Sequence, residues 1–256
     1  MSTPIDISEE GGVRYLHFGS DWVQGAMRIR KPNALELAYT REMMAGLLLR
    51  DGLVDDPGEW PEDVLIIGLG AASLAKFVYH NCPQARIKVV EIAPQVVAAA
   101  RQFFKLPAED ARFSIHVGCG AQYVLEHDRH FDYVLVDGFD RNARAGALDT
   151  LPFYQAVRSR LSDRGLMAVN LFGRSRGYKA SLERIITAFD DRALAFPSVD
   201  SGNVVAFAAA GEPIERSLAE LRERAALLKW GTGLDLLPTV TRLEQAGTVP
   251  GGVLML

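Results

Sequence analysis

A glycine turn followed by an acidic residue is the part of this chain whose residue types and spacing best suit chemistry. Gly68 and Gly70 lie between an apolar run and a helix-like segment, and a second apolar run ends at Glu91. Glycines let a backbone approach a ligand closely, and the helix N-terminus behind them favours anionic groups. An acid about 20 residues after such a turn accepts hydrogen bonds from ribose hydroxyls. The pattern predicts a nucleoside site, with glycines that serve only a tight turn as the alternative.

Two aspartates follow a later apolar run, Phe131 to Val136. Asp137 comes directly after this run, and Asp140 follows it closely. Ligands of open α/β sheets bind outside the carboxyl ends of the strands, so both acids are expected beside the glycine turn. A carboxylate there can accept a proton from an attacking amine or hydroxyl, or hold a cationic substrate. The alternative is that either acid caps the next helix or turn.

The segment after another predicted strand, His116 to Ala121, lies where this fold often contacts an adenine ring. Gly118 and Gly120 suit a close backbone approach. Cys119 could be a reactive thiol, but a small buried apolar residue is the favoured interpretation. The Phe153-Tyr154 pair is expected in the core, where it would not contact substrate.

Strands and helices that alternate must position these residues. Alternation predicts an α/β, Rossmann-like, mostly parallel sheet with helices on both faces. The expected strands cover 64–68, 87–91, 112–117, 132–137 and 165–171. The expected helices lie near 73–81, 94–104, 120–127, 152–161 and 178–190. Two further runs, 192–197 and 203–209, are separated by a short Ser/Asp/Gly/Asn link that favours a C-terminal antiparallel strand pair.

The flanking segments are expected to be smaller units. A β-hairpin is predicted within 13–29, followed by a helix that Asn33 caps and that runs to about Arg50. Amphipathic helices are predicted at 213–229 and 237–246. The expected division is an N-terminal hairpin and helix (1–55), a nucleoside-binding domain (56–212) and a C-terminal helical extension (213–256).

Composition excludes several classes of function. The chain has 256 residues, of which 48% are hydrophobic and 23% charged, and a net charge of −4. Acids and bases are interspersed, so no nucleic-acid partner is indicated, and no apolar run approaches the ~20 residues that span a membrane. Cys82 and Cys119 have no metal-ligand spacing and form no disulfide framework, and the polar N-terminus is unlike a signal peptide. We therefore expect a cytoplasmic protein without a metal.

Over residues 13–210 the chain resembles the spermidine synthase (polyamine aminopropyltransferase) family. The similarity lies in VLIIGLG, in KVVEI ending at Glu91, in HVGCGAQYV, and above all in FDYVLVDGFD with the following LPFY. The resemblance implies a fold like that of class I S-adenosylmethionine-dependent methyltransferases. It implies aminopropyl transfer from decarboxylated S-adenosylmethionine to a small amine acceptor, and a homodimer, which apolar residues at 253–256 also suggest.

The resemblance also implies roles for nine residues. Asp137 would accept the proton of the attacking amine, while Asp140 and Tyr39 would bind the amine substrate. The others would surround the nucleoside: Gly68 and Gly70 beneath it, Glu91 at the ribose, Cys119 (through its backbone) and Gly120 at the adenine, and Gln24.

Departures from the family pattern keep two alternatives open. Ala71 stands where the family has an acid in its glycine turn, and the loop after Asp140 carries Arg141 and Arg144. Loss of an acid removes a repulsion against the carboxylate of ordinary S-adenosylmethionine, which would favour a methyltransferase on the same scaffold. Because several pocket positions differ at once, a catalytically silent nucleoside-binding protein is the second alternative.

Overall fold

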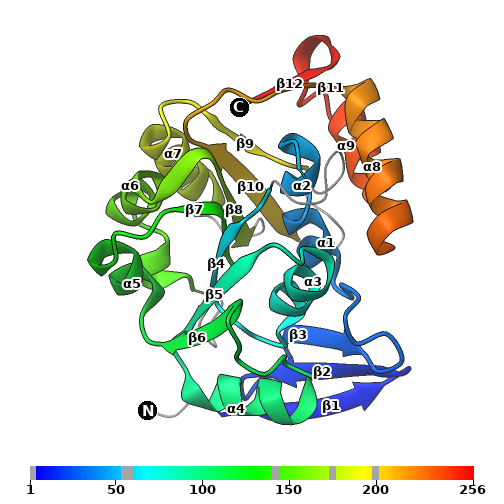
Figure 1. Ribbon diagram of the computed structural model, residues 1–256, viewed down its shortest axis with the longest axis vertical. Helices are drawn as coiled ribbons and strands as arrows, with labels where there is room; N and C mark the ends of the chain where they lie inside the picture. Colours follow the sequence, from blue (N-terminus) through cyan, green and yellow to red (C-terminus); the bar gives the residue numbers. More distant parts are fainter. Residues whose placement is uncertain (1–3, 53–59, 140–143, 173–176, 198–201) are drawn as a thin grey trace.

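A central seven-stranded sheet positions the residues singled out above (Figure 1). The computed structural model describes residues 4–52, 60–139, 144–172, 177–197 and 202–256. The strand order is β6-β5-β4-β7-β8-β10-β9, in which β10 runs antiparallel to both neighbours and the other pairs are parallel. The strands are β4 (Asp63–Ile67), β5 (Arg86–Glu91), β6 (Phe113–Val117), β7 (Phe131–Val136), β8 (Leu161–Phe172), β9 (Ala193–Ala195) and β10 (Asn203–Ala209). The predicted α/β class and the antiparallel pair are thus confirmed.

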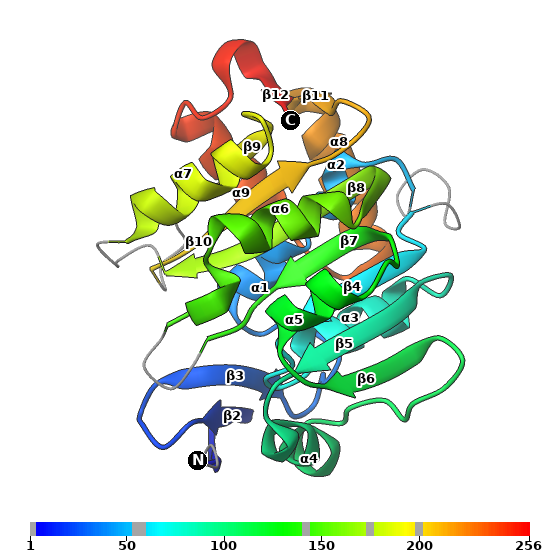
Figure 2. The same cartoon turned by 90° about the vertical axis from the view of Figure 1, so that its left-hand side faces the viewer.

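Helices cover both faces of this sheet (Figure 2). They are α3 (Ser73–Asn81), α4 (Pro94–Phe103), α5 (Gly120–Glu126), α6 (Leu151–Ser159) and α7 (Tyr178–Ala188). Side chains alternate along β4: Val64 and Ile66 pack with α3 and α4, whereas Leu65 and Ile67 pack with α5, α6 and α7. Because successive side chains of a strand point to opposite faces, each face has its own apolar core.

The N-terminal segment forms a separate three-stranded antiparallel sheet. The predicted hairpin is present as β2 (Val13–His17) and β3 (Val23–Arg28), and β1 (Asp6–Glu10) adds an outer strand. Four of the five residues of β1 are exposed. Its acidic sequence carries no apolar alternation, which is why the sequence predicts only the hairpin.

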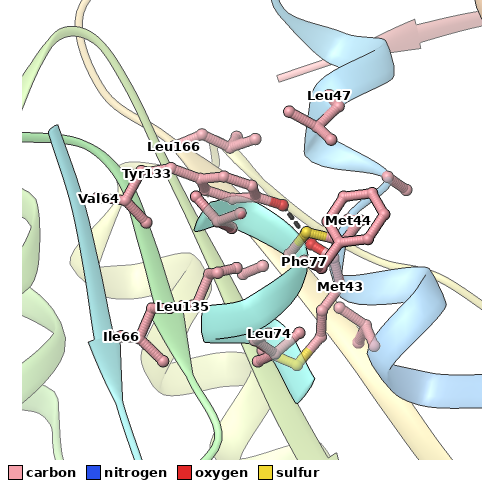
Figure 3. Close-up of a cluster of buried hydrophobic side chains, with 14 of the residues drawn as sticks. Met43, Met44, Leu47, Val64, Ile66, Leu74, Phe77, Tyr133, Leu135 and Leu166 are labelled. Carbon is pink, nitrogen blue, oxygen red and sulfur yellow. Dashed lines mark hydrogen bonds between the residues drawn. The ribbon is translucent and has the colours of Figure 1, made fainter. Parts of the chain in front are cut away.

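The single helix predicted from Asn33 to Arg50 is wrong: two short helices, α1 (Ala38–Met43) and α2 (Gly46–Leu49), occupy the segment. Asn33 caps neither helix. The hydroxyl of Tyr133 donates to the Met43 carbonyl (Figure 3), and the Leu47 N–H bonds to the Met44 carbonyl at 3.0 Å. A continuous helix would need the Met43 carbonyl to accept from Leu47. A tyrosine far away in the sequence thus bonds to the carbonyl at which the helix is interrupted.

The C-terminal segment returns to the main body. It contains β11 (Glu215–Ser217), α8 (Leu218–Thr232), α9 (Leu237–Gln245), η2 (Pro250–Gly252) and β12 (Val253–Met255). Strand β12 pairs with β11, and Leu254 and Leu256 are buried in the same chain. Leu254 and Leu256 are therefore not available for the dimer contact that the sequence suggests, whereas Met255 is 71% exposed. The division into three domains stays a prediction. Within the described residues, no helix combines the length and apolar character needed to cross a membrane.

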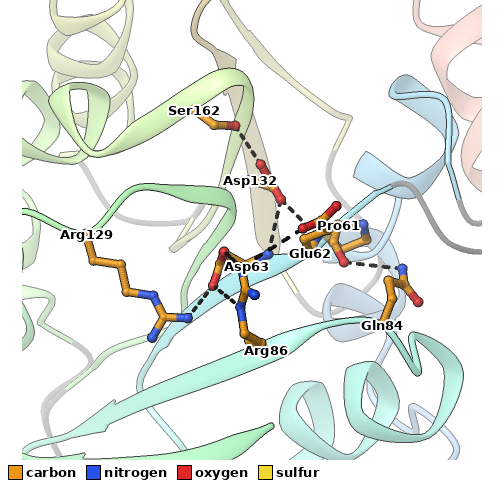
Figure 4. Close-up of polar contacts among 8 residues, drawn as sticks. All are labelled: Pro61, Glu62, Asp63, Gln84, Arg86, Arg129, Asp132 and Ser162. Atoms are coloured by element: carbon orange, nitrogen blue, oxygen red, sulfur yellow. Dashed lines mark hydrogen bonds and ion pairs between the residues drawn. The ribbon is translucent and has the colours of Figure 1, made fainter.

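Two acidic side chains at the amino ends of the parallel strands, Asp63 and Asp132, make structural contacts (Figure 4). Asp132, at the start of β7, accepts from the backbone N–H groups of Glu62 and Asp63 at 2.9 and 3.1 Å and from the Ser162 hydroxyl at 2.6 Å. Asp63 pairs with two arginines, Arg86 and Arg129. Chemistry must therefore be sought at the opposite, carboxyl ends.

Candidate active site

A cavity of about 390 Å³ lies at the carboxyl ends of the strands. It is lined by eight of the nine predicted residues: Gln24, Tyr39, Gly68, Gly70, Glu91, Cys119, Gly120 and Asp137. The ninth, Asp140, lies outside the described residues. The two carboxylates of Glu91 and Asp137 thus face one cavity, as a shared nucleoside and acceptor site requires.

The glycine turn is required first by the protein's own backbone. Gly68 has φ +95°, and a Cβ there would overlap the main-chain carbonyl of Asp137. Only glycine allows β4 and β7 to approach so closely at this edge. Gly70 has φ +50°, and its Cβ would meet only the Gln24 carbonyl oxygen at 3.1 Å. Gly68 therefore serves the tight turn, the alternative given above, and both glycines also line the cavity.

Glu91 ends β5 and is 7% exposed. Its Oε2 accepts from the N–H of Leu69 at 2.8 Å, and its Oε1 accepts from the N–H of Ala93 at 2.9 Å. Burial raises the pKa of Glu91, while these backbone hydrogen bonds act in the opposite direction. Each carboxylate oxygen can accept a further hydrogen bond. Backbone N–H groups thus fix an acid that lines the cavity and can accept from a ligand.

Asp137 directly follows β7, and two side chains orient its carboxylate. Its Oδ2 accepts from the Tyr39 hydroxyl at 3.1 Å, and its Oδ1 accepts from Asn170 Nδ2 at 2.8 Å. Burial raises the pKa of Asp137, and both hydrogen bonds oppose that rise. Burial and the charge of Asp137 raise the pKa of Tyr39 well above its usual value, so the phenol keeps its proton and remains a donor.

The Asp137 site can therefore accept a proton from a ligand. A carboxylate whose pKa is raised is a stronger base than an exposed one, and its remaining lone pairs are free for a donor. The oriented carboxylate is thus suited to proton transfer or to binding a cation.

The sequence does not predict two further polar residues of the cavity, Asn170 and Asn203. Asn170, in β8, is 4% exposed. Its Oδ1 accepts from Asn203 Nδ2 at 2.9 Å, at the start of β10. Asn170 could have been found as the one polar residue inside the apolar run Leu166–Leu171. Asn203 could not, because it follows a polar link and looks like part of it.

The segment that the sequence predicts beside an adenine departs little from expectation. Gly120 begins α5, and a Cβ there would overlap the Ile67 side chain. Cys119 is partly buried and packs against the core that contains α5, which agrees with an apolar environment. Phe153 and Tyr154 are 2% and 0% exposed and lie in the core, as expected.

Four aromatic side chains that the sequence analysis did not predict also line the cavity. Phe18, Trp22, Phe139 and Phe172 line the cavity. The rings of Trp22 and Phe172 lie with centroids 6.0 Å apart, and Trp22 is 51% exposed. In the sequence these residues look no different from aromatic residues of the core, so the sequence does not predict that they line the cavity.

The structure gives no support to the argument made from Ala71. This residue is 2% exposed, packs with Leu16, Met27 and Phe104, and is absent from the described cavity lining. Arg144 does line the cavity, as the loop arginines suggested, while Arg141 lies outside the described residues.

In the described part of the chain, no three His, Cys, Asp or Glu side chains gather as a metal ion would require.

Comparisons with known proteins agree with the geometry. Residues 37–171 match the family model described as "Spermine/spermidine synthase domain". The chain is 38% identical over 231 residues to a polyamine aminopropyltransferase of Neisseria meningitidis (90% of this chain, 85% of the relative). It is 36% identical over 252 residues to that of Chromobacterium violaceum (98% and 94%). Its fold is similar to that of human methyltransferase-like protein 13 in complex with SAH, with a TM-score of 0.67, 25% identity, and 77% and 93% of the two chains covered.

Proposed function

We propose that this chain, which belongs to the spermine/spermidine synthase family, transfers an aminopropyl group from decarboxylated S-adenosylmethionine to a small amine. The observation that carries the proposal is the partly buried Asp137 carboxylate, which Tyr39 and Asn170 orient in the same cavity as Glu91. The names of the two bacterial relatives support the same reaction.

The nucleoside half of the substrate fits the Glu91 end of the cavity. A volume of about 390 Å³ falls in the range of small-molecule sites. We assign the free lone pairs of Glu91 to the ribose hydroxyls, with Gly68 and Gly70 beneath the sugar. The Cys119 backbone and Gly120 would face the adenine, and Gln24 closes the site from β3.

Asp137 acts at the reacting end. The amine nitrogen attacks the aminopropyl carbon next to the sulfonium, the C–S bond breaks, and its electron pair returns to sulfur to give neutral methylthioadenosine. The nitrogen becomes positively charged as the C–N bond forms, and Asp137 accepts one of its protons. The remaining contribution is alignment of nitrogen, carbon and sulfur in a site that holds both partners.

The amine is held by acids and by the tyrosine. We assign Tyr39, already hydrogen-bonded to Asp137, and Asp140 to the acceptor. A polyamine carries at least two positive charges, so a second acid beyond Asp137 is expected to raise its affinity, and Asp140 is the candidate.

Product analysis tests the proposal. The purified protein is incubated with putrescine and either decarboxylated or ordinary S-adenosylmethionine, and products are identified by mass spectrometry. We expect spermidine and methylthioadenosine in equal amounts from the decarboxylated form. A methylated acceptor from the ordinary form would instead support methyl transfer, which the similarity to human methyltransferase-like protein 13 favours. No turnover of either form would support a silent binding protein.

We further propose that the protein works in the cytoplasm as a homodimer. Both cysteines are free, as a reducing compartment requires, with Cys82 buried. The interface must be sought away from Leu254 and Leu256, which are buried within one chain. Sedimentation velocity distinguishes the dimer from a monomer.

A further inference from the structure

Three polar side chains from three neighbouring strands form one hydrogen-bonded chain that ends on Asp137. Asn203 Nδ2 donates to Asn170 Oδ1 at 2.9 Å, and Asn170 Nδ2 donates to Asp137 Oδ1 at 2.8 Å. Asn170 lies on β8, which is adjacent to β7, and Asn203 lies on β10, the next strand beyond β8. The proposed reaction uses Asp137, which Asn170 helps to orient, but gives Asn203 no task.

The orientation of the Asn170 amide determines whether the Asp137 carboxylate faces a hydrogen-bond donor or an acceptor. An amide group has nearly the same shape when its oxygen and nitrogen exchange places, but one end donates and the other accepts. In the observed orientation, the amide nitrogen stabilises an ionised Asp137. In the opposite one, two oxygens would face each other about 2.8 Å apart, the distance of the present bond. That arrangement is favourable only if Asp137 carries a proton and donates it to Asn170.

Asn203 is positioned to decide between these orientations. Asn170 is 4% exposed, so water has little access to its amide. Asn203 donates on the side away from Asp137, so Asn170 presents its oxygen to Asn203 and its nitrogen to Asp137. A buried amide with its acceptor satisfied in this way has a strong preference for one orientation.

We propose that Asn203 is a positioning residue that locks Asn170 as a donor and so keeps the Asp137 carboxylate ionised and ready to take a proton from the amine. The inference rests on the proposed function for its purpose, since Asp137 is useful as a base only when ionised. The predicted effect on the protonation of Asp137 exists in the protein without substrate, so it can be measured without turnover.

Other ionisable groups near Asp137 also affect its protonation. Among the described residues that line the cavity they are Tyr39, Glu91, Cys119 and Arg144. Tyr39 donates directly to Asp137 at 3.1 Å, and Glu91 is held by backbone N–H groups of the glycine turn and of α4. Asn203 variants leave these residues in place. A change in the titration of Asp137 in such a variant therefore reports on the hydrogen-bonded chain from Asn203 through Asn170 to Asp137, here called the asparagine relay.

A carboxyl-¹³C NMR titration tests the proposal. The full chain is labelled at aspartate, the Asp137 signal is assigned by its loss in Asp137→Asn, and its midpoint is measured in the wild type and in Asn203→Leu. We expect Asn203→Leu to move the midpoint upward by about one pH unit, a tenfold change in proton affinity. In the Asn170→Leu background, Asn203→Leu should cause no further shift, since its effect passes through Asn170.

Val204→Ala is the matched control, because Val204 is the next residue of β10, is 5% exposed and is absent from the described cavity lining. An unchanged midpoint in Asn203→Leu, or a similar shift in Val204→Ala, overturns the proposal. If Asn203→Leu does not fold, Asn203→Ala removes the same donor with a smaller side chain. If the midpoint moves in a protein that transfers no aminopropyl group, the relay stands and the proposed function fails.

Discussion

Replacing Asp137 by asparagine removes the proton acceptor while it keeps the shape of the site. The amide has no basic lone pair, but it can still accept from Tyr39 or Asn170, which contact the carboxylate at 3.1 and 2.8 Å. General-base contributions of about 10²- to 10⁴-fold correspond to about 3–5 kcal/mol of barrier. We therefore expect Asp137→Asn to lower kcat by that factor.

Binding and folding should change far less. Glu91, which we assign to the ribose, is held by Leu69 and Ala93 and makes no contact with Asp137 among those described. Affinity for methylthioadenosine, measured by calorimetry, should remain within a few-fold of the wild type. Because burial is the main cause that raises the pKa of Asp137, removing its charge should change the free energy of unfolding by no more than about 1 kcal/mol.

Asp132→Asn is the matched control, since Asp132 lies at the other end of the same strand. It accepts from two backbone N–H groups and from Ser162, so its loss should lower stability by about 1–2 kcal/mol and leave kcat unchanged. The reasoning is refuted if Asp137→Asn keeps wild-type kcat, or if Asp132→Asn loses kcat to the same extent as Asp137→Asn.

Three further outcomes are expected. Tyr39→Phe removes a donor to Asp137, so the acid-side midpoint of the kcat/KM profile should rise by about one pH unit; an unmoved midpoint would contradict this. Burial raises the pKa of Glu42 to about 7 despite its pairing with Arg242. The folded protein thus binds this proton more tightly, so stability should fall as pH rises toward 7, and thermal melts of Glu42→Gln should lose that slope. Burial lowers the pKa of Lys76 to about 7, so stability should rise with pH above 7; Lys76→Met with an unchanged slope would refute that reasoning.

The main sheet was predictable because its signals are local. Apolar runs separated by a glycine turn and by amphipathic helices specify strands and crossovers, and the acids at strand ends follow from the topology. For this reason Glu91 and Asp137 could be placed at one edge without a structure. Strand β1 (Asp6–Glu10) could not, because its acidic residues have no alternation.

Features that depend on distant contacts were not predictable in the same way. The break between α1 and α2 lies where the Tyr133 hydroxyl donates to the Met43 carbonyl. Ala71 looked like part of the pocket because it follows the glycine turn, yet its methyl group packs into an apolar cluster under the N-terminal sheet. Asn170 and Asn203 become neighbours only when β10 pairs with β8. Sequence spacing carries no information on such pairings.

A crystal structure of the protein with bound methylthioadenosine tests the central claim most directly. We predict that the ribose hydroxyls lie within hydrogen-bond distance of the Glu91 carboxylate and that the sulfur lies on the Asp137 side of the cavity. A nucleoside bound outside this cavity, or one whose sulfur points away from Asp137, would contradict the account.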